Sequence, residues 1–123
     1  MPFHLDHTIV PARDKEASAR WFARIMGLEY KGTWGHFAPV KVDEHLSMDF
    51  DDREEIPSLH FAFITSDQEF DTIFQRVKDE GITYGSGPRS LDDMQINHKH
   101  QGRGVYFRDP NGHVLEVITH TYV

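Results

Sequence analysis

Residues 104–117 read GVYFRDPNGHVLEV, two apolar runs separated by a DPNG segment with strong turn signals. Proline presets the second turn position, and asparagine and glycine tolerate the positive φ that closes a hairpin, so two antiparallel strands are predicted here. Glu116 shares a strand face with Val114 and Ile118, and we therefore expect its carboxylate to point into the structure. Because an unpaired buried carboxylate costs several kcal/mol, the pattern predicts a cation, a hydrogen-bond network or a metal beside it.

The chain contains two halves of similar sequence. The segments LDHTIVPA and SLHFAFIT each place a histidine at the start of an apolar run, and these residues, His7 and His60, are 53 positions apart. A helical pattern follows each run and ends at a glycine, and Gly27 and Gly81 are 54 positions apart. GLEY follows in one half and GITY in the other. This parallel indicates an internal repeat.

Both halves continue with short predicted strands. The helices begin after the capping residues Asp14 and Ser66. The strands that follow are LEYKGTW, HFAPVKV and HLSMDF in the first half, and ITYGSG, GVYFRD and HVLEVIT in the second. The order of a strand, a helix and three strands, present twice, predicts an α+β fold. We expect a single domain over 1–123, with one module of about 1–52 and another of about 58–123.

Composition excludes several classes of function. A chain of 123 residues with 38% hydrophobic residues suits one domain. No apolar stretch approaches the roughly 20 residues of a membrane span, and MPFHLDH lacks an export pattern, so we expect a soluble, cytoplasmic protein without a membrane partner. Thirteen basic residues are scattered among twenty acids, for a net charge of −7, which argues against nucleic acid as a partner. The chain has no cysteine, so a metal would need histidine, aspartate or glutamate.

His7, His60 and Glu116 form a candidate metal site. A single histidine at the start of an apolar strand is more often a hydrogen-bonded core or strand-edge residue than a ligand. Two histidines at equivalent repeat positions favour the ligand interpretation, because with one acid they supply two imidazoles and a carboxylate. Such a set leaves coordination positions open and is typical of divalent-metal enzymes. Iron, manganese, nickel and zinc all suit these ligands, so the metal is not specified.

The motif YFRDPNGHVLEV, with DHTIVPARD, MGLEY and LHFAFI, resembles the vicinal oxygen chelate superfamily. That superfamily includes glyoxalase I, bleomycin-resistance proteins, fosfomycin-resistance transferases and extradiol dioxygenases. The resemblance implies two βαβββ modules that form a cupped mixed sheet with helices on its outer face. It also implies that His7, His60 and Glu116 bind a divalent metal within the cup. Members with one pair of modules are commonly homodimers with shared sites, so a homodimer that binds a small-molecule substrate is expected.

The resemblance leaves the reaction open, with extradiol ring cleavage favoured. Tyr106 precedes the closing acid by ten residues, as in the dioxygenases, and His98 and His100 in NHKHQGRG precede its strand. We therefore name Tyr106, His98 and His45 as candidate catalytic residues that steer protons. Two alternatives stay open, because the NHKHQG segment also fits a polar loop and Tyr106 also fits a core aromatic position.

Glyoxalase-type isomerisation, catalysed by a lyase, is the alternative reaction. Glyoxalase I uses a fourth ligand, an acid that closes the first module, and Asp49 is the repeat counterpart of Glu116. Aspartate is shorter than glutamate by one methylene, and Pro11 occupies the position of a glyoxalase arginine. A fosfomycin-type transferase ranks third, because its anionic substrate would meet a protein of negative net charge.

A second class of function is a small-molecule binding protein of the bleomycin-resistance type, which works without catalysis. Metal-free binders of this kind commonly lack the histidine pair and the glutamate. Because this sequence contains all three, we predict a metal-dependent enzyme, a dioxygenase or lyase, that acts on a small substrate with two adjacent oxygen donors.

Overall fold

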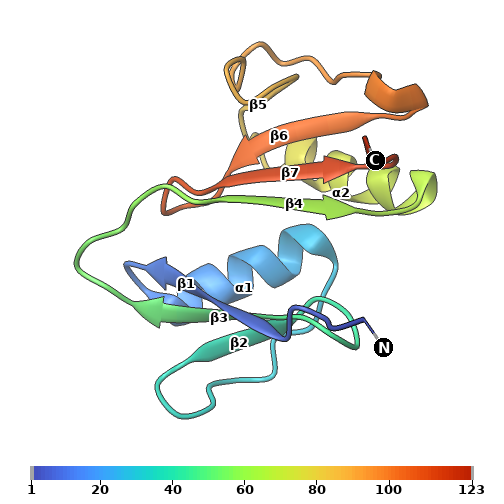
Figure 1. Ribbon diagram of the computed structural model, residues 1–123. Coiled ribbons are helices and arrows are strands. Elements are labelled where there is room, and N and C mark those ends of the chain that lie inside the picture. Colours follow the sequence, from blue (N-terminus) through green and yellow to red (C-terminus); the bar gives the residue numbers. More distant parts are fainter. Residues whose placement is uncertain (1, 123) are drawn as a thin grey trace. The chain divides into compact units, whose positions relative to one another are not determined.

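The computed structural model describes residues 2–122 in two units, with the boundary between Pro57 and Ser58. Each unit begins with a strand followed by a helix and then returns through further strands (Figure 1). The fold is therefore α+β and contains two βαβββ modules, as the sequence predicts. Within residues 2–122, no helix combines the length and the apolar character that crossing a membrane requires.

The first unit is a three-stranded sheet with helix α1 across one face. The central strand, β3, pairs parallel with β1 and antiparallel with β2. Asp14 caps α1 by accepting from the Ala17 N–H at 3.1 Å, and Gly27 ends it with a left-handed φ of 73°. Phe22 of α1 packs on Phe50 of the sheet with ring centroids 5.7 Å apart. The elements are β1 (His7–Ala12), α1 (Lys15–Met26), β2 (Ala38–Lys41) and β3 (Ser47–Asp52).

The second unit is a four-stranded sheet in the order β4-β7-β6-β5, with helix α2. Strand β7 pairs parallel with β4 and antiparallel with β6. The hydroxyl of Ser66 caps α2 by accepting from the Glu69 N–H at 3.1 Å, so the predicted cap is confirmed. The elements are β4 (His60–Ile64), α2 (Asp67–Asp79), β5 (Tyr84–Gly85), the short 3-10 helix η1 (Lys99–Gln101), β6 (Gly104–Arg108) and β7 (Val114–Ile118).

The strand that follows each helix is shorter than the sequence suggested. LEYKGTW contributes only a single bridge, between Tyr30 and Val40, and ITYGSG contributes only the two residues of β5. In the first unit, Gly32 takes a φ of 101°, which turns the chain out of the strand direction two residues after the bridge. In the second, the chain returns so closely that a Cβ on Gly85 would collide with backbone atoms of Leu91.

The DPNG segment forms the predicted turn, which is tied to the beginning of β4. One carboxylate oxygen of Asp109 accepts from the backbone N–H groups of Asn111 and His113, each at 2.9 Å. The ring of His113 is fully buried, and its Nδ1 accepts from the Leu59 N–H at 3.0 Å. These bonds fix the register of β7 between its two neighbours, which determines where Glu116 lies.

Glu116 faces away from the main core of the second unit. The buried residues of β7 are Leu115 and Val117, whereas Val114, Glu116 and Ile118 are only half-buried on the opposite face. Glu116 does share a face with Val114 and Ile118, as the sequence predicts, and that face is the half-buried one, because the alternation along β7 gives the core face to Leu115 and Val117. The side chain of Glu116 is still only 16% exposed, because the residues around it close over that face.

Candidate functional site

His60, Tyr106 and Glu116 form a hydrogen-bonded cluster on adjacent strands of the second unit. Nε2 of His60 lies 2.9 Å from Oε1 of Glu116, and the hydroxyl of Tyr106 donates to Oε2 at 2.8 Å. The strand register produces this grouping. Tyr106 is directly opposite Glu116 on β6, and His60 lies on β4 two residues before Ala62, which is the parallel partner of Glu116. Both carboxylate oxygens are thus engaged, which supplies the partners that burial of Glu116 requires.

Tyr106 acts in this cluster as a protonated donor. Burial, the hydrogen bond to Glu116 and the negative charge of that carboxylate together raise the pKa of Tyr106 to about 12. The phenol therefore keeps its proton at physiological pH. The hydroxyl of Tyr106 donates to Oε2 of Glu116, so the carboxylate oxygen that faces His60 is Oε1.

The cluster fits part of a metal site. Two ligand atoms at right angles on an ion with bonds of about 2.0–2.2 Å lie about 3 Å apart. The 2.9 Å between Nε2 of His60 and Oε1 of Glu116 matches this separation. Among residues 2–122, however, no three His, Asp or Glu side chains are grouped closely enough to hold an ion. The second unit thus supplies two donor atoms of suitable chemistry.

The first unit contains the corresponding pair, His7 and Asp49. Asp49 pairs with Ile9, two residues after His7, and Glu116 pairs with Ala62, two residues after His60. The two halves are therefore alike in strand register as well as in sequence. His7 and Asp49 line a pocket of about 390 Å³, which we call the His7 pocket. The residues lining it are Asp6, His7, Trp34, Phe37, Pro39, Ser47 and Asp49.

Asp6 orients the ring of His7. Its carboxylate lies 2.8 Å from Nδ1, and this hydrogen bond, with a smaller contribution from the charge of Asp49, raises the pKa of His7 above 6.5. A carboxylate on one ring nitrogen is the usual support of a metal-binding histidine, since it directs the other nitrogen toward the metal. Asp49 accepts from the hydroxyl of Ser47 at 2.6 Å. Nε2 of His7 is therefore the nitrogen best placed to act as a ligand.

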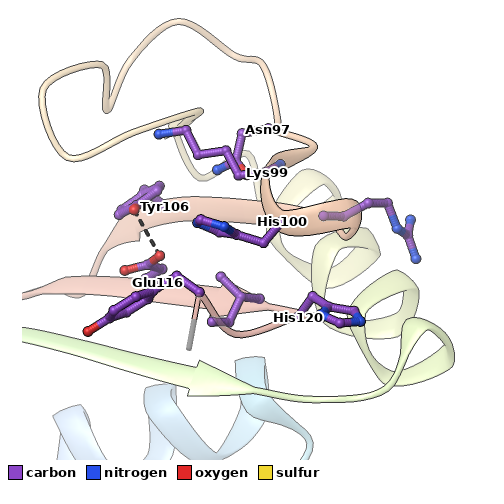
Figure 2. A pocket seen from close by; sticks show the side chains of 9 residues that line it. Asn97, Lys99, His100, Tyr106, Glu116 and His120 are labelled. Atoms are coloured by element: carbon purple, nitrogen blue, oxygen red, sulfur yellow. Dashed lines mark hydrogen bonds between the residues drawn. The ribbon is translucent and has the colours of Figure 1, made fainter.

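A second pocket, of about 220 Å³, opens beside Tyr106 and Glu116, and we call it the Glu116 pocket. Figure 2 shows Asn97 and Lys99 above the Tyr106–Glu116 hydrogen bond and His100 beside it, with His120 farther along the chain from Glu116. Basic side chains thus gather at this pocket in a protein of net charge −7. The lining residues are Asn97, Lys99, His100, Arg103, Tyr106, Glu116, Ile118, His120 and Tyr122.

Two of the candidate catalytic histidines lie away from these pockets. His98 precedes η1 as an exposed residue, while His100 of the same loop lines the Glu116 pocket. His100 and Gln101 both take left-handed backbone conformations, with φ of 57° and 63°, which changes the direction of the side chains along this loop. His45 is exposed between β2 and β3, with its ring stacked on His4 at 4.0 Å. The catalytic roles of His98 and His45 remain predictions.

Several residues of the two pockets were not identified from the sequence. Asp6 had a local signal, an acid directly before the candidate ligand His7. His120 and Trp34 had none, because their positions at the pockets depend on loop conformation and not on a periodic pattern. Arg103 was overlooked in NHKHQGRG because its contacts are with α2, more than thirty residues earlier.

The chain matches the model of the Glyoxalase/Bleomycin resistance protein/Dioxygenase superfamily over residues 4–117. The solved structure of Oxidase ChaP-H2 is 47% identical, with a TM-score of 0.95, and the match covers 99% of this chain and 97% of that one. Glutathione transferase FosA from Serratia marcescens is 25% identical over 92% of this chain and 78% of its own length. Metallothiol transferase FosB from Shouchella clausii (strain KSM-K16) is 33% identical over 57% of this chain and 45% of its own length.

Proposed function

Because the chain belongs to the Glyoxalase/Bleomycin resistance protein/Dioxygenase superfamily, we propose that it is a metal-dependent oxidase of a small molecule with two adjacent oxygen donors. Extradiol-type cleavage of a dihydroxylated ring is the leading reaction. The similarity to Oxidase ChaP-H2 over nearly the whole of both chains supports oxidation. The observation that carries the proposal is the 2.9 Å approach of His60 to Glu116, because it brings an imidazole and a carboxylate together at ligand spacing.

In this proposal His60 and Glu116 hold the metal together with His7. Such a metal, when bound, would supply Lewis acidity toward adjacent substrate oxygens and, if it is iron or manganese, one-electron chemistry toward dioxygen. Tyr106 holds Oε2 of Glu116 through its hydroxyl, which keeps Oε1 directed toward His60. Asp6 holds Nδ1 of His7, which leaves Nε2 for the metal.

We also propose that the active form is a homodimer in which His7 of one copy completes the site of the other. His7 belongs to the first unit, whereas His60 and Glu116 belong to the second. Asp49, the counterpart of Glu116, is a candidate fourth ligand, although its bond from Ser47 already engages one oxygen. The proposed active protein is cytoplasmic.

Metal content tests the proposal directly. The protein is purified without chelator, and its metal is measured by elemental analysis for the unmodified chain and for His60→Ala, His7→Ala and Glu116→Gln. We expect a stoichiometric metal in the unmodified chain and a substoichiometric metal content in each variant, because each variant lacks one proposed ligand. His4→Ala is the matched control, because His4 is an exposed histidine of the first unit, and it should retain the metal. Equal metal content in His60→Ala would overturn the assignment.

Oxygen consumption then identifies the reaction. The metal-loaded protein is supplied with catechols in an oxygen electrode, and ring-opened products are sought by mass spectrometry. Oxygen uptake with incorporation of both oxygen atoms supports dioxygenation. Turnover of a hemithioacetal without oxygen uptake would instead identify a glyoxalase-type isomerase and refute the oxidase proposal.

A thiol transferase is the second candidate. The basic lining of the Glu116 pocket favours it, because Lys99 and His100 suit an anionic substrate, and FosA and FosB are relatives of this kind. Consumption of glutathione in the presence of a small electrophile, measured with a thiol reagent, distinguishes this reaction from oxidation.

A further inference from the structure

Two aromatic side chains stand on one side of a tight hairpin at the His7 pocket. Trp34 and Phe37 form an antiparallel pair through reciprocal N–H···O bonds of 2.9 and 3.1 Å. Gly35 takes a φ of 60°, which suits the first central position of a two-residue hairpin turn. Because directly paired residues project to the same face, Trp34 and Phe37 share one face of the hairpin, and both line the pocket.

The hairpin is anchored at its tip through His36. Its carbonyl accepts from Nζ of Lys15 at 2.7 Å, and its Nδ1 lies 3.2 Å from a carboxylate oxygen of Asp51. The ring of His36 lies 4.0 Å from that of Phe37, measured between centroids. These contacts connect the hairpin to α1 and β3. The aromatic pair is therefore held in place before any ligand arrives, which lowers the entropic cost of binding.

The large apolar side chain of Trp34 lines the His7 pocket and is 75% exposed. Large exposed aromatic residues beside a pocket mark binding sites more often than scattered surface residues do. The same pocket is also lined by His7 and Asp49, polar residues of the first unit. The lining of the His7 pocket therefore combines aromatic faces with polar groups, among them an imidazole and a carboxylate.

We propose that Trp34 and Phe37 form a stacking site for a planar aromatic ring. The ring lies against the two side chains, and its oxygen-bearing edge faces His7. This inference rests on the proposed function in one respect, that the ring belongs to the substrate, and it adds which residues of the first unit hold the aromatic face. A pocket of about 390 Å³ is large enough for a fused bicyclic ring.

The test uses 2,3-dihydroxynaphthalene as the probe and metal-free protein, so that binding does not depend on the metal. The chain has two tryptophans, Trp21 and Trp34, so a ¹H–¹⁵N spectrum shows two indole N–H signals, and Trp34→Phe identifies which belongs to Trp34. We expect the probe to shift the Trp34 signal through its ring current. The same concentration of trans-1,2-cyclohexanediol, which has adjacent hydroxyl groups but no aromatic face, should leave that signal in place.

Calorimetry measures the contribution of each ring. We expect Trp34→Ala and Phe37→Ala each to weaken probe binding by about 3- to 10-fold, the range of aromatic pair energies. Trp34→Phe, which keeps an aromatic face, should lose less than Trp34→Ala. Phe3→Ala is the matched control, because Phe3 is 96% exposed but does not line the pocket, and it should bind as the unmodified chain does.

Three results would overturn the stacking site. They are an absence of probe binding, an unshifted Trp34 signal with probe bound, or unchanged affinity in Trp34→Ala. If Trp34→Ala leaves the affinity for the probe unchanged and instead changes the number of chains in the assembly, a second copy of the chain covers the Trp34 ring. That result also contradicts the proposal. If the probe binds as expected but the metal-loaded protein consumes no oxygen with it, the proposed function fails while the stacking site stands.

Discussion

Replacing Arg103 by lysine should destabilise the protein, because this guanidinium joins the start of β6 to the first turns of α2. Its Nη1 donates to Asp71 at 2.6 Å, and its Nη2 donates to both the carboxylate and the carbonyl of Asp67 at 3.1 Å. The guanidinium also lies over the ring of Phe70, 4.5 Å from its centroid. A lysine is a point charge that keeps one ion pair but loses the fork and the flat stacking surface.

The structure limits the size of the effect. The side chain of Arg103 is 25% exposed, but the carboxylates of Asp67 and Asp71 are 77% and 66% exposed, so each ion pair is a surface pair. A lost surface pair costs about 0.2–1 kcal/mol and a lost cation–π contact about 0.5–1 kcal/mol. We therefore expect Arg103→Lys to lower the free energy of unfolding by about 1–2 kcal/mol, which lowers Tm by roughly 3–8 °C in a chain of this size.

Urea unfolding followed by circular dichroism measures this loss. The matched control is Arg89→Lys, an exposed arginine, which should remain within about 0.5 kcal/mol of the unmodified chain. A double-mutant cycle of Arg103→Ala with Asp71→Ala isolates the 2.6 Å pair, and 1 M NaCl should reduce the measured coupling because the Debye length falls to about 3 Å. Unchanged stability in Arg103→Lys, or a coupling energy of zero with Asp71, would refute the reasoning.

Three further predictions follow from the geometry. If each site combines His7 of one copy with His60 of another, mixing unfolded His7→Ala and His60→Ala chains and refolding them together should restore one intact metal site per mixed dimer, whereas refolding either chain alone should not. Hydrogen bonds from Ser86 and from backbone N–H groups lower the pKa of Asp93, so this loop is stabilised above pH 3.8 and should lose protection from amide exchange as the pH falls further; Asp93→Asn should abolish that pH dependence. Gly85→Ala should cost about 1–3 kcal/mol or more, because its Cβ would collide with backbone, while Gly87→Ala, which has nothing within 4 Å, should cost less; equal denaturation midpoints would contradict this.

Part of the candidate site could be predicted because it depends on local chemistry and on the repeat. The position of Glu116 follows from the DPNG turn and from the alternation of apolar residues that continues into β7. His7 and His60 were paired because each begins the same pattern, and the structure places them at equivalent register to Asp49 and Glu116. Register of this kind is set by nearest neighbours in a sheet, so it follows once the strands are identified.

Other parts of the site could not be predicted, because they depend on where loops run in space. The NHKHQGRG segment presents His100 to the Glu116 pocket because two successive residues take positive φ, a conformation that neither helical nor strand periodicity reveals. Trp34 reaches the His7 pocket through a tight hairpin in a region that the sequence assigned to a longer strand.

The sequence by itself determined the two βαβββ modules, their helix caps and the closing hairpin, because those features rest on contacts between residues close in the chain. Tertiary structure alone decided that His60 comes within hydrogen-bond distance of Glu116, across 56 residues of chain, and that Glu116 faces away from the core. The physical reason is that contacts between side chains on different strands depend on which strands become neighbours and in what register they pair. That choice is made by the packing of the whole unit and is not encoded in any one segment.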